Sequence, residues 1–227
     1  MIFRWLKKHL EERRERRFVD KVLKYSREYE LEAKKARFGE SQDELVLRFF
    51  RGVEDERIPR TVDQVEAFSD DDMEMYHDFI QWVYPTIQPS NLHPDAPVIS
   101  EKFADMISAD KCALHNYCRT CRRYLKYLNF KCEGDGEVLL CAGKDATPEE
   151  HAKDFYQLPG HNYLRITRAL NSLRETGHLK CSRRLYAALL HSLKYAPKQW
   201  VSKVTLEYWK DTQKQEEKKR KQENRFD

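Results

Sequence analysis

The sequence predicts an all-α protein: a compact orthogonal bundle of several helices with a long proline-rich loop, a small irregular insertion and a charged N-terminal helix. Two observations predict this class. The 227 residues include only seven glycines and eight prolines, a composition that favours helices over turn-rich sheets. Apolar residues also recur at the three- and four-residue spacing of amphipathic helices. We therefore expect a core buried between helices.

The charge and cysteine content restrict the class of protein further. Charged residues make up 35% of the chain, yet the net charge is only +4, too small to indicate nucleic-acid binding by the whole molecule. No apolar run approaches the roughly 20 residues that span a bilayer, and the first ten residues lack the features of a secretory signal. We expect an intracellular protein, cytoplasmic or nuclear and not secreted, whose six cysteines are reduced.

Residues 1–44 form a charged N-terminal extension that we predict to be helical in part, because apolar side chains recur there at helical spacing. At its start, residues 1–10 combine apolar and basic side chains. Such a segment fits contact with an anionic membrane surface. It fits docking on the protein's own core or on a partner equally well.

Helix-terminating signals divide the next stretch, and a domain is predicted over residues 45–212. LVLRFFRG reads as a helix closed by Gly52. Thr61 and Ser69 are typical N-caps for TVDQVEAF and DDDMEMYHDFIQWVY. In the second of these helices, Ile80 and Trp82 are expected to anchor the core. Four prolines between positions 85 and 97 then prevent a continuous helix and predict a long loop.

Further helices follow that loop. A helical region begins at Ser100, and glycines bracket a segment around residues 132–147 that fits either a small hairpin or an exposed insertion. The tail at 213–227 has no apolar stripe and is predicted to be flexible. The other helices are expected at 111–128, 148–156, 162–176 before Gly177, 180–195 before Pro197, and 200–212.

His115, Cys118 and Cys121 have a spacing seen in metal sites, and further candidate ligands follow at Cys132, Cys141 and His151. However, both cysteines of the CxxC also fall on one seam of an amphipathic helix, formed with Leu114, Leu125 and Leu128. A free cysteine packs there as a small hydrophobic side chain. We therefore expect core cysteines, no metal site and no other cofactor.

Signals of catalysis are weak. His77 and Asp78 are adjacent, and adjacent helical residues point about 100° apart, so they cannot form a working pair. The sequence has no P-loop, GxGxxG, HExxH or nucleophile-elbow motif. The protein is expected not to be an enzyme.

The segment HNYLRITRALNSL, residues 161–173, places polar residues on one face of a predicted helix. His161, Arg165, Arg168 and Ser172 follow one another at steps of four, three and four. Two arginines one turn apart suit a carboxylate or phosphate ligand, and they suit a structural salt bridge as well. Asn162 is expected to be the N-cap. The buried side is predicted to comprise Leu164, Ile166, Leu170 and Leu173.

The tail contains a basic run, KKRK at 218–221. It fits a nuclear-import or nucleic-acid-binding patch, and a solvated charge run produces the same pattern. Together with the basic N-terminal helix, it provides an alternative function, nucleic-acid association.

Several segments resemble the conserved domain of the opioid growth factor receptor family: RFFRG (48–52), TVDQVEAFSDDDMEMYHDFIQWVYP (61–85), NLHPDAPVIS (91–100), HNYLRITRALNSLRETG (161–177) and VTLEYWKDT (204–212). The resemblance covers about residues 45–212. It implies an all-helical domain unrelated to the seven-helix opioid receptors. Vertebrate members are described as intracellular, nucleus-associated receptors for an enkephalin peptide that restrain cell proliferation.

The resemblance thus implies a non-enzymatic, receptor-like protein that binds a peptide or protein partner. No ligand-binding residues are established for the family, so the resemblance identifies only the residues of the shared motifs. His161, Arg165, Arg168 and Ser172 form the hypothetical ligand site, and a structural role for the two arginines is the alternative that the family does not settle. We expect the fold to be anchored by Ile80, Gln81, Trp82, Pro85, Asn162, Leu164, Ile166 and Leu170.

Overall fold

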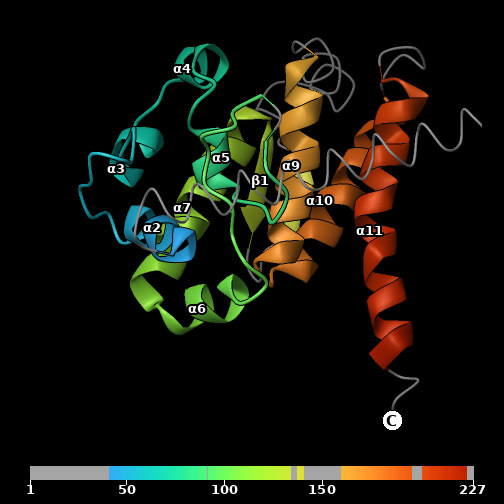
Figure 1. Cartoon of the computed structure of the whole chain (residues 1–227). Coiled ribbons are helices and arrows are strands. Elements are labelled where there is room, and N and C mark those ends of the chain that lie inside the picture. The colour runs from blue at the N-terminus through green and yellow to red at the C-terminus, as the bar shows by residue number, and fades with distance from the viewer. Residues whose placement is uncertain (1–40, 91, 134–136, 141–159, 196–200, 224–227) are drawn as a thin grey trace, which may run out of the picture.

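The computed structural model describes residues 41–90, 92–133, 137–140, 160–195 and 201–223 (Figure 1). The predicted N-terminal helix, the predicted helix 148–156 and the candidate ligands Cys141 and His151 lie outside these residues. The described helices are α2 (Gln42–Phe50), α3 (Val62–Glu66), α4 (Asp70–Met75), α5 (Ile80–Val83), α6 (Phe103–Ala109), α7 (Lys111–Tyr127), α9 (His161–Glu175), α10 (Leu179–Ser192) and α11 (Lys203–Glu223). The predicted all-α class is confirmed.

A short antiparallel hairpin is the one sheet among the described residues, formed by β1 (Phe130–Glu133) and β2 (Glu137–Leu140). It lies in the segment where the sequence left a hairpin and an exposed insertion as alternatives. Figure 1 shows α2, α3 and α4 on one side of the molecule and α9, α10 and α11 on the other. The long helix α7 contacts α2, α3, α4, α5, α6 and β1, so the core of the first side is built around it.

Local capping chemistry sets several helix ends where the sequence predicted them. Thr61 and Ser69 each form a capping box, in which the hydroxyl accepts from a backbone N–H and a side chain three residues on accepts in return. Gly177 ends α9 with φ 84°, a left-handed conformation that favours glycine. There the N–H of Gly177 donates to the Arg174 carbonyl and that of His178 to the Leu173 carbonyl, which makes a Schellman motif.

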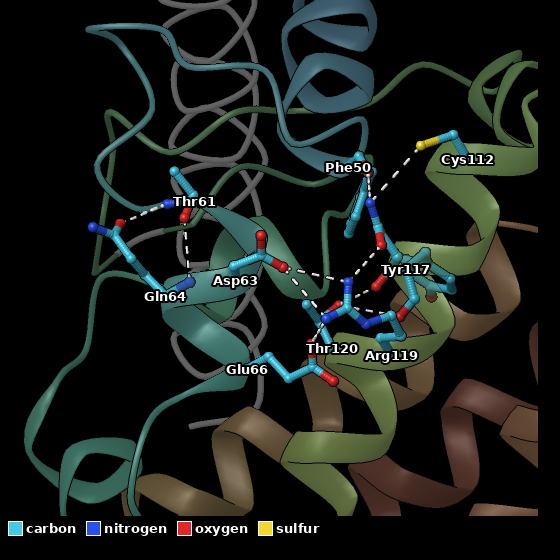
Figure 2. Close-up of polar contacts among 10 residues, drawn as sticks. Phe50, Thr61, Asp63, Gln64, Glu66, Cys112, Tyr117, Arg119 and Thr120 are labelled. Atoms are coloured by element: carbon cyan, nitrogen blue, oxygen red, sulfur yellow. Dashed lines mark hydrogen bonds and ion pairs between the residues drawn. The ribbon is translucent and has the colours of Figure 1, made fainter.

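Arginines on one side of α7 fix the two acidic helices that precede it. Figure 2 shows Arg119 reaching Asp63 and Glu66, both on α3. One turn further on, Arg123 donates to the Phe68 carbonyl at 2.6 Å and pairs with Asp70 at 2.7 Å. These contacts place the short helices α3 and α4 against α7, although both are too short to be stable alone.

Two predicted helix boundaries are wrong. The helix expected from residue 70 to residue 84 is broken at 76–79 into α4 and α5, for a reason given by the contacts of α9 below. The last helix, expected to end at 212, continues to Glu223 and includes KKRK. Residues 213–223 consist of glutamine, glutamate, lysine and arginine, which are strong helix formers that need no apolar stripe to extend an existing helix.

The proline-rich loop between α5 and α6 is attached to the rest of the domain at its far end. Thr86 and Val98 form a parallel bridge. The N–H of Val98 donates to Gln42 Oε1 at 2.7 Å, and the N–H and hydroxyl of Ser100 both donate to Asp43. Because Gln42 and Asp43 begin α2, the loop is tied to the first described helix.

Trp209 attaches α11 to the bundle. Its side chain is fully buried, its ring lies 6.1 Å from that of Tyr163 on α9, and both α9 and α10 contact α11. The neighbouring Tyr208 points outward and is 60% exposed.

We predict that Trp209→Ala lowers the free energy of unfolding by about 3–5 kcal/mol, because a large buried aromatic is replaced by a cavity. Chemical denaturation measures this change. The matched variant Tyr208→Ala should cost less than about 0.5 kcal/mol, as for other surface changes. Equal effects of the two substitutions would show that α11 does not dock through Trp209.

Candidate functional site

The first turn of α9 lies against Glu74 of α4. Asn162 is fully buried inside this turn, and Gly160 takes the N-cap position, so the prediction that Asn162 is the N-cap is wrong. Its amide Nδ2 donates to Glu74 Oε2 at 3.0 Å and to the Tyr127 hydroxyl at 3.2 Å. Tyr127 also donates to Glu74 Oε2. The asparagine therefore connects α9 with α4 and α7.

Arg165, one turn along α9, is 5% exposed and has several hydrogen-bond acceptors around its guanidinium. Nη1 donates to the Met73 carbonyl at 2.7 Å, and Nη2 donates to the Tyr76 carbonyl at 2.8 Å. Nη2 also lies 2.6 Å from His77 Nδ1. Carbonyls that an uninterrupted helix would use internally are thus taken by Arg165, which accounts for the break between α4 and α5.

Two histidine rings lie beside the Arg165 guanidinium and Glu74. A guanidinium can only donate, so His77 Nδ1 is the acceptor in its contact with Arg165. The His161 ring packs edge-on against the His77 ring, with centroids 5.0 Å apart. His161 Nε2 lies 3.0 Å from Glu74 Oε1, in a geometry that makes no hydrogen bond.

Burial and charge shift the titration of this group. Burial acts to raise the pKa of Glu74, but hydrogen bonds from Tyr127 and Asn162, with the nearby His161 and Arg165, lower it overall. Burial, followed by the positive charge of Arg165, lowers the pKa of His161. Glu74 is therefore the anion of the cluster, Arg165 its permanent cation, and His161 is favoured as a neutral ring.

Arg168 has a different environment, although it lies only three residues further along α9. Its Nε donates to the Tyr84 carbonyl at 2.7 Å, which directs the half-buried guanidinium toward the start of the proline-rich loop. Neither terminal nitrogen of Arg168 has a hydrogen-bond partner in the part of the chain that the structure describes. Burial lowers its pKa to about 10, and the charge of Glu175 offsets only part of that effect.

Glu175 connects the last turn of α9 to the same loop. Its Oε2 accepts from the Ile87 N–H at 2.8 Å, and its Oε1 pairs with Arg174 at 3.1 Å. Burial raises the pKa of Glu175 despite these contacts. Because Tyr84 and Ile87 are both attached to α9, the loop beside Arg168 has a fixed starting direction.

The structure thus separates the four predicted ligand-binding residues. Arg165 and Ser172 are buried, His161 lies against Glu74, and Arg168 keeps two terminal nitrogens without a partner among the described residues. Of the predicted anchors, Leu164 is 59% exposed, so its predicted burial is wrong. The other motif residues are buried: Ile80, Gln81, Trp82, Pro85, Asn162, Ile166 and Leu170.

The metal candidates on α7 do not converge. His115 is exposed, Cys118 is half-buried and Cys121 is buried. Across the described residues, no three His, Cys, Asp or Glu side chains are grouped as metal ligands would be. Sequence reasoning missed Glu74 and Tyr127 and considered His77 only as a pair with Asp78, because the partners of these residues lie 35 or more residues away. No local spacing signals such contacts.

Fold and geometry together define a helical domain in which Arg168, with two terminal nitrogens that lack a partner among the described residues, lies beside an attached proline-rich loop. Comparison with known proteins identifies the family of this domain. The pattern described as the opioid growth factor receptor (OGFr) conserved region matches residues 42–226, and the chain belongs to this family.

A distant relative is the rat (Rattus norvegicus) opioid growth factor receptor, which is 31% identical over 106 residues. The match covers 46% of this chain and 17% of the rat protein, so this chain corresponds to a small part of that receptor. No solved structure matches. None of the helices in the described ranges has the length and apolar character needed to cross a bilayer.

We predict that Arg165→Ala lowers the free energy of unfolding by about 2–6 kcal/mol. The Met73 and Tyr76 carbonyls lose their donor, at about 1–3 kcal/mol for each group. Arg168→Ala should cost about half as much, about 1–3 kcal/mol, because only the Tyr84 carbonyl loses its donor. Urea denaturation of the two variants separates these roles, and equal losses would contradict them.

Stability should also fall in acid. Because the folded-state pKa of His161 lies below its ordinary 6.5, the unfolded chain binds a proton more readily. The contribution of His161 to the free energy of unfolding is therefore complete well above pH 6.5. It is lost as the pH falls through 6.5 toward the folded-state pKa. Urea denaturation at pH 7.5 and 5.5 should show a smaller loss for His161→Gln than for the wild type. If His161→Gln and the wild type lose the same stability between the two pH values, His161 does not cause the loss.

Proposed function

We propose that this chain is a non-enzymatic, intracellular, receptor-like protein that binds a peptide or protein partner, with Arg168 as the anchor for a carboxylate. Membership in the opioid growth factor receptor conserved-region family supports a receptor-like role, including regulation of cell growth. The observation that carries the proposal is the guanidinium of Arg168, which is half-buried and lacks acceptors for its terminal nitrogens among the described residues.

A carboxylate suits this arginine for physical reasons. Partial burial weakens the hydration of the guanidinium, so an incoming anion interacts with it more strongly than with a fully solvated side chain. Two parallel N–H groups match the two oxygens of a carboxylate. Arg165 offers no such pair, because both of its terminal nitrogens already donate to backbone carbonyls.

Glu74, His77 and Glu175 support binding rather than catalysis. Glu74 Oε2 accepts from Tyr127 and Asn162, and His77 Nδ1 accepts from Arg165. Glu175 accepts from the Ile87 backbone. These groups are occupied in holding the domain together, whereas a general acid or base must be able to exchange a proton with a ligand.

The test is binding of an enkephalin peptide, the ligand that the family resemblance implies, measured by isothermal titration calorimetry. We expect Arg168→Gln to weaken binding by about 10- to 100-fold, since hydrogen bonds to charged groups contribute about 1.5–3 kcal/mol. Arg122→Gln, which removes the same charge from an exposed position on α7, is the matched control and should bind as the wild type does. Absence of Arg168-dependent binding would contradict the proposal.

A further inference from the structure

The helix α7 contains no aspartate or glutamate, and its lysines and arginines divide into two groups. Arg119 and Arg123 pair with acidic residues of α3 and α4. Lys111, Arg122 and Lys126 are instead exposed to solvent. The first group holds the domain together, and the second has no such role.

The exposed cations lie along one face of α7. Lys111, His115, Arg122 and Lys126, which we call the basic stripe, follow one another at steps of four, seven and four. At about 100° and 1.5 Å per residue, the stripe occupies a sector of about 60° and is about 22 Å long. None of its side chains has a hydrogen bond or ion pair within the described ranges.

The stability of α7 does not account for the basic stripe. Like charges one turn apart, such as Arg122 and Lys126, repel each other. The helix dipole favours a cation in the last turn, which suits Lys126, but disfavours Lys111 in the first turn. The carboxylate next to Lys111 in the sequence, Asp110, pairs with Arg51 at 2.6 Å. The positive charge of the stripe is thus uncompensated on its own helix.

The helix α10 borders the basic stripe and adds no negative charge to it. Cys118 lies one turn before Arg122, and its thiol interacts electrostatically with Arg122 and with Cys181 on α10. The helix α10 also lacks aspartate and glutamate, and Lys180 in its first turn is exposed. An anion that approaches the stripe therefore meets no carboxylate from either helix.

The side chains that α7 does not expose restrict the kind of partner. None of the large apolar side chains exposed in the described part of the chain belongs to α7. Membrane-bound helices and the centres of protein interfaces both bury such side chains. Tyr117, Tyr124 and Tyr127 are buried, so α7 offers no aromatic ring on which single-stranded bases could stack. A duplex, which presents phosphates at its surface, requires neither feature.

We propose that the basic stripe of α7 binds the phosphate backbone of a double-stranded nucleic acid without reading its base sequence. A duplex carries one negative charge per about 1.7 Å of its axis, so each cation of the stripe can find a phosphate. Contacts of this kind position a protein on a duplex but do not discriminate between sequences. The inference goes beyond the proposed function and does not involve Arg168, which contacts the Tyr84 carbonyl.

The experiment measures fluorescence anisotropy of a labelled duplex of about 20 base pairs, prepared as DNA and as RNA, with the full chain at 50–200 mM salt. The test variant is Arg122→Gln/Lys126→Gln. Lys194→Gln/Lys203→Gln, which removes two exposed lysines outside α7, is the matched control. Circular dichroism checks that both variants are folded. Unlabelled duplex, polyglutamate and vesicles that contain phosphatidylserine serve as competitors.

We expect the wild type to bind a duplex with an affinity whose logarithm falls linearly with the logarithm of the salt concentration. The test variant should reduce this slope by about 1.8 and weaken binding at 100 mM salt by about 10- to 60-fold, as for the loss of two phosphate contacts. The control should keep the slope of the wild type. Binding of either duplex in this way supports the proposal, and the tighter one identifies the source of the phosphates.

Three results would overturn the proposal. One is that the wild type binds neither duplex. Another is that the test variant and the control have equal effects, which would assign binding to the overall charge rather than to the stripe. The third is that polyglutamate or the vesicles displace the labelled duplex as well as unlabelled duplex does, which would assign the stripe to an acidic protein or to a membrane.

Discussion

The buried guanidinium of Arg165 is the interaction on which the arrangement of this domain depends. A buried cation is tolerated only when acceptors surround it, and here they come from the backbone at Met73 and Tyr76. To provide them, the chain must leave the helical conformation after α4. The bend then places Ile80 and Trp82 in the core, and it places His77 where its Nδ1 contacts the Arg165 guanidinium. One side chain of α9 thus determines the course of a segment almost ninety residues earlier.

Arg168 shows how a second arginine on the same helix acquires a different role. Both side chains reach backbone carbonyls, but Arg165 uses both terminal nitrogens, whereas Arg168 uses only Nε. The loop beside Arg168 is held by Glu175 at one end and by the start of α2 at the other. A binding group that is positioned by rigid surroundings loses little conformational entropy when a ligand arrives. The fold therefore positions Arg168 without using up its capacity to donate.

Features set by local chemistry were predictable from the sequence, and features set by distant contacts were not. The caps at Thr61 and Ser69 and the end of α9 at Gly177 depend on residues within one turn, and they lie where the pattern indicates. The broken helix and the buried position of Asn162 depend on partners in other elements. The polar face of α9 was also recognisable by its spacing. The sequence pattern could not show which of the two arginines has all its donors occupied. That depends on backbone carbonyls in other segments, which the pattern of a single helix does not contain.

The most direct test of this division of roles is ¹⁵N NMR of the arginine side chains during titration with N-acetyl-leucine, which carries one carboxylate and one apolar side chain. The account predicts that the guanidinium signals of Arg168 shift as the ligand is added. Those of Arg165 should remain in place, with slow exchange of their protons with water. Shifts at Arg165, or no response at Arg168 while other sites respond, would contradict the assignment of a structural and a binding arginine to one helix.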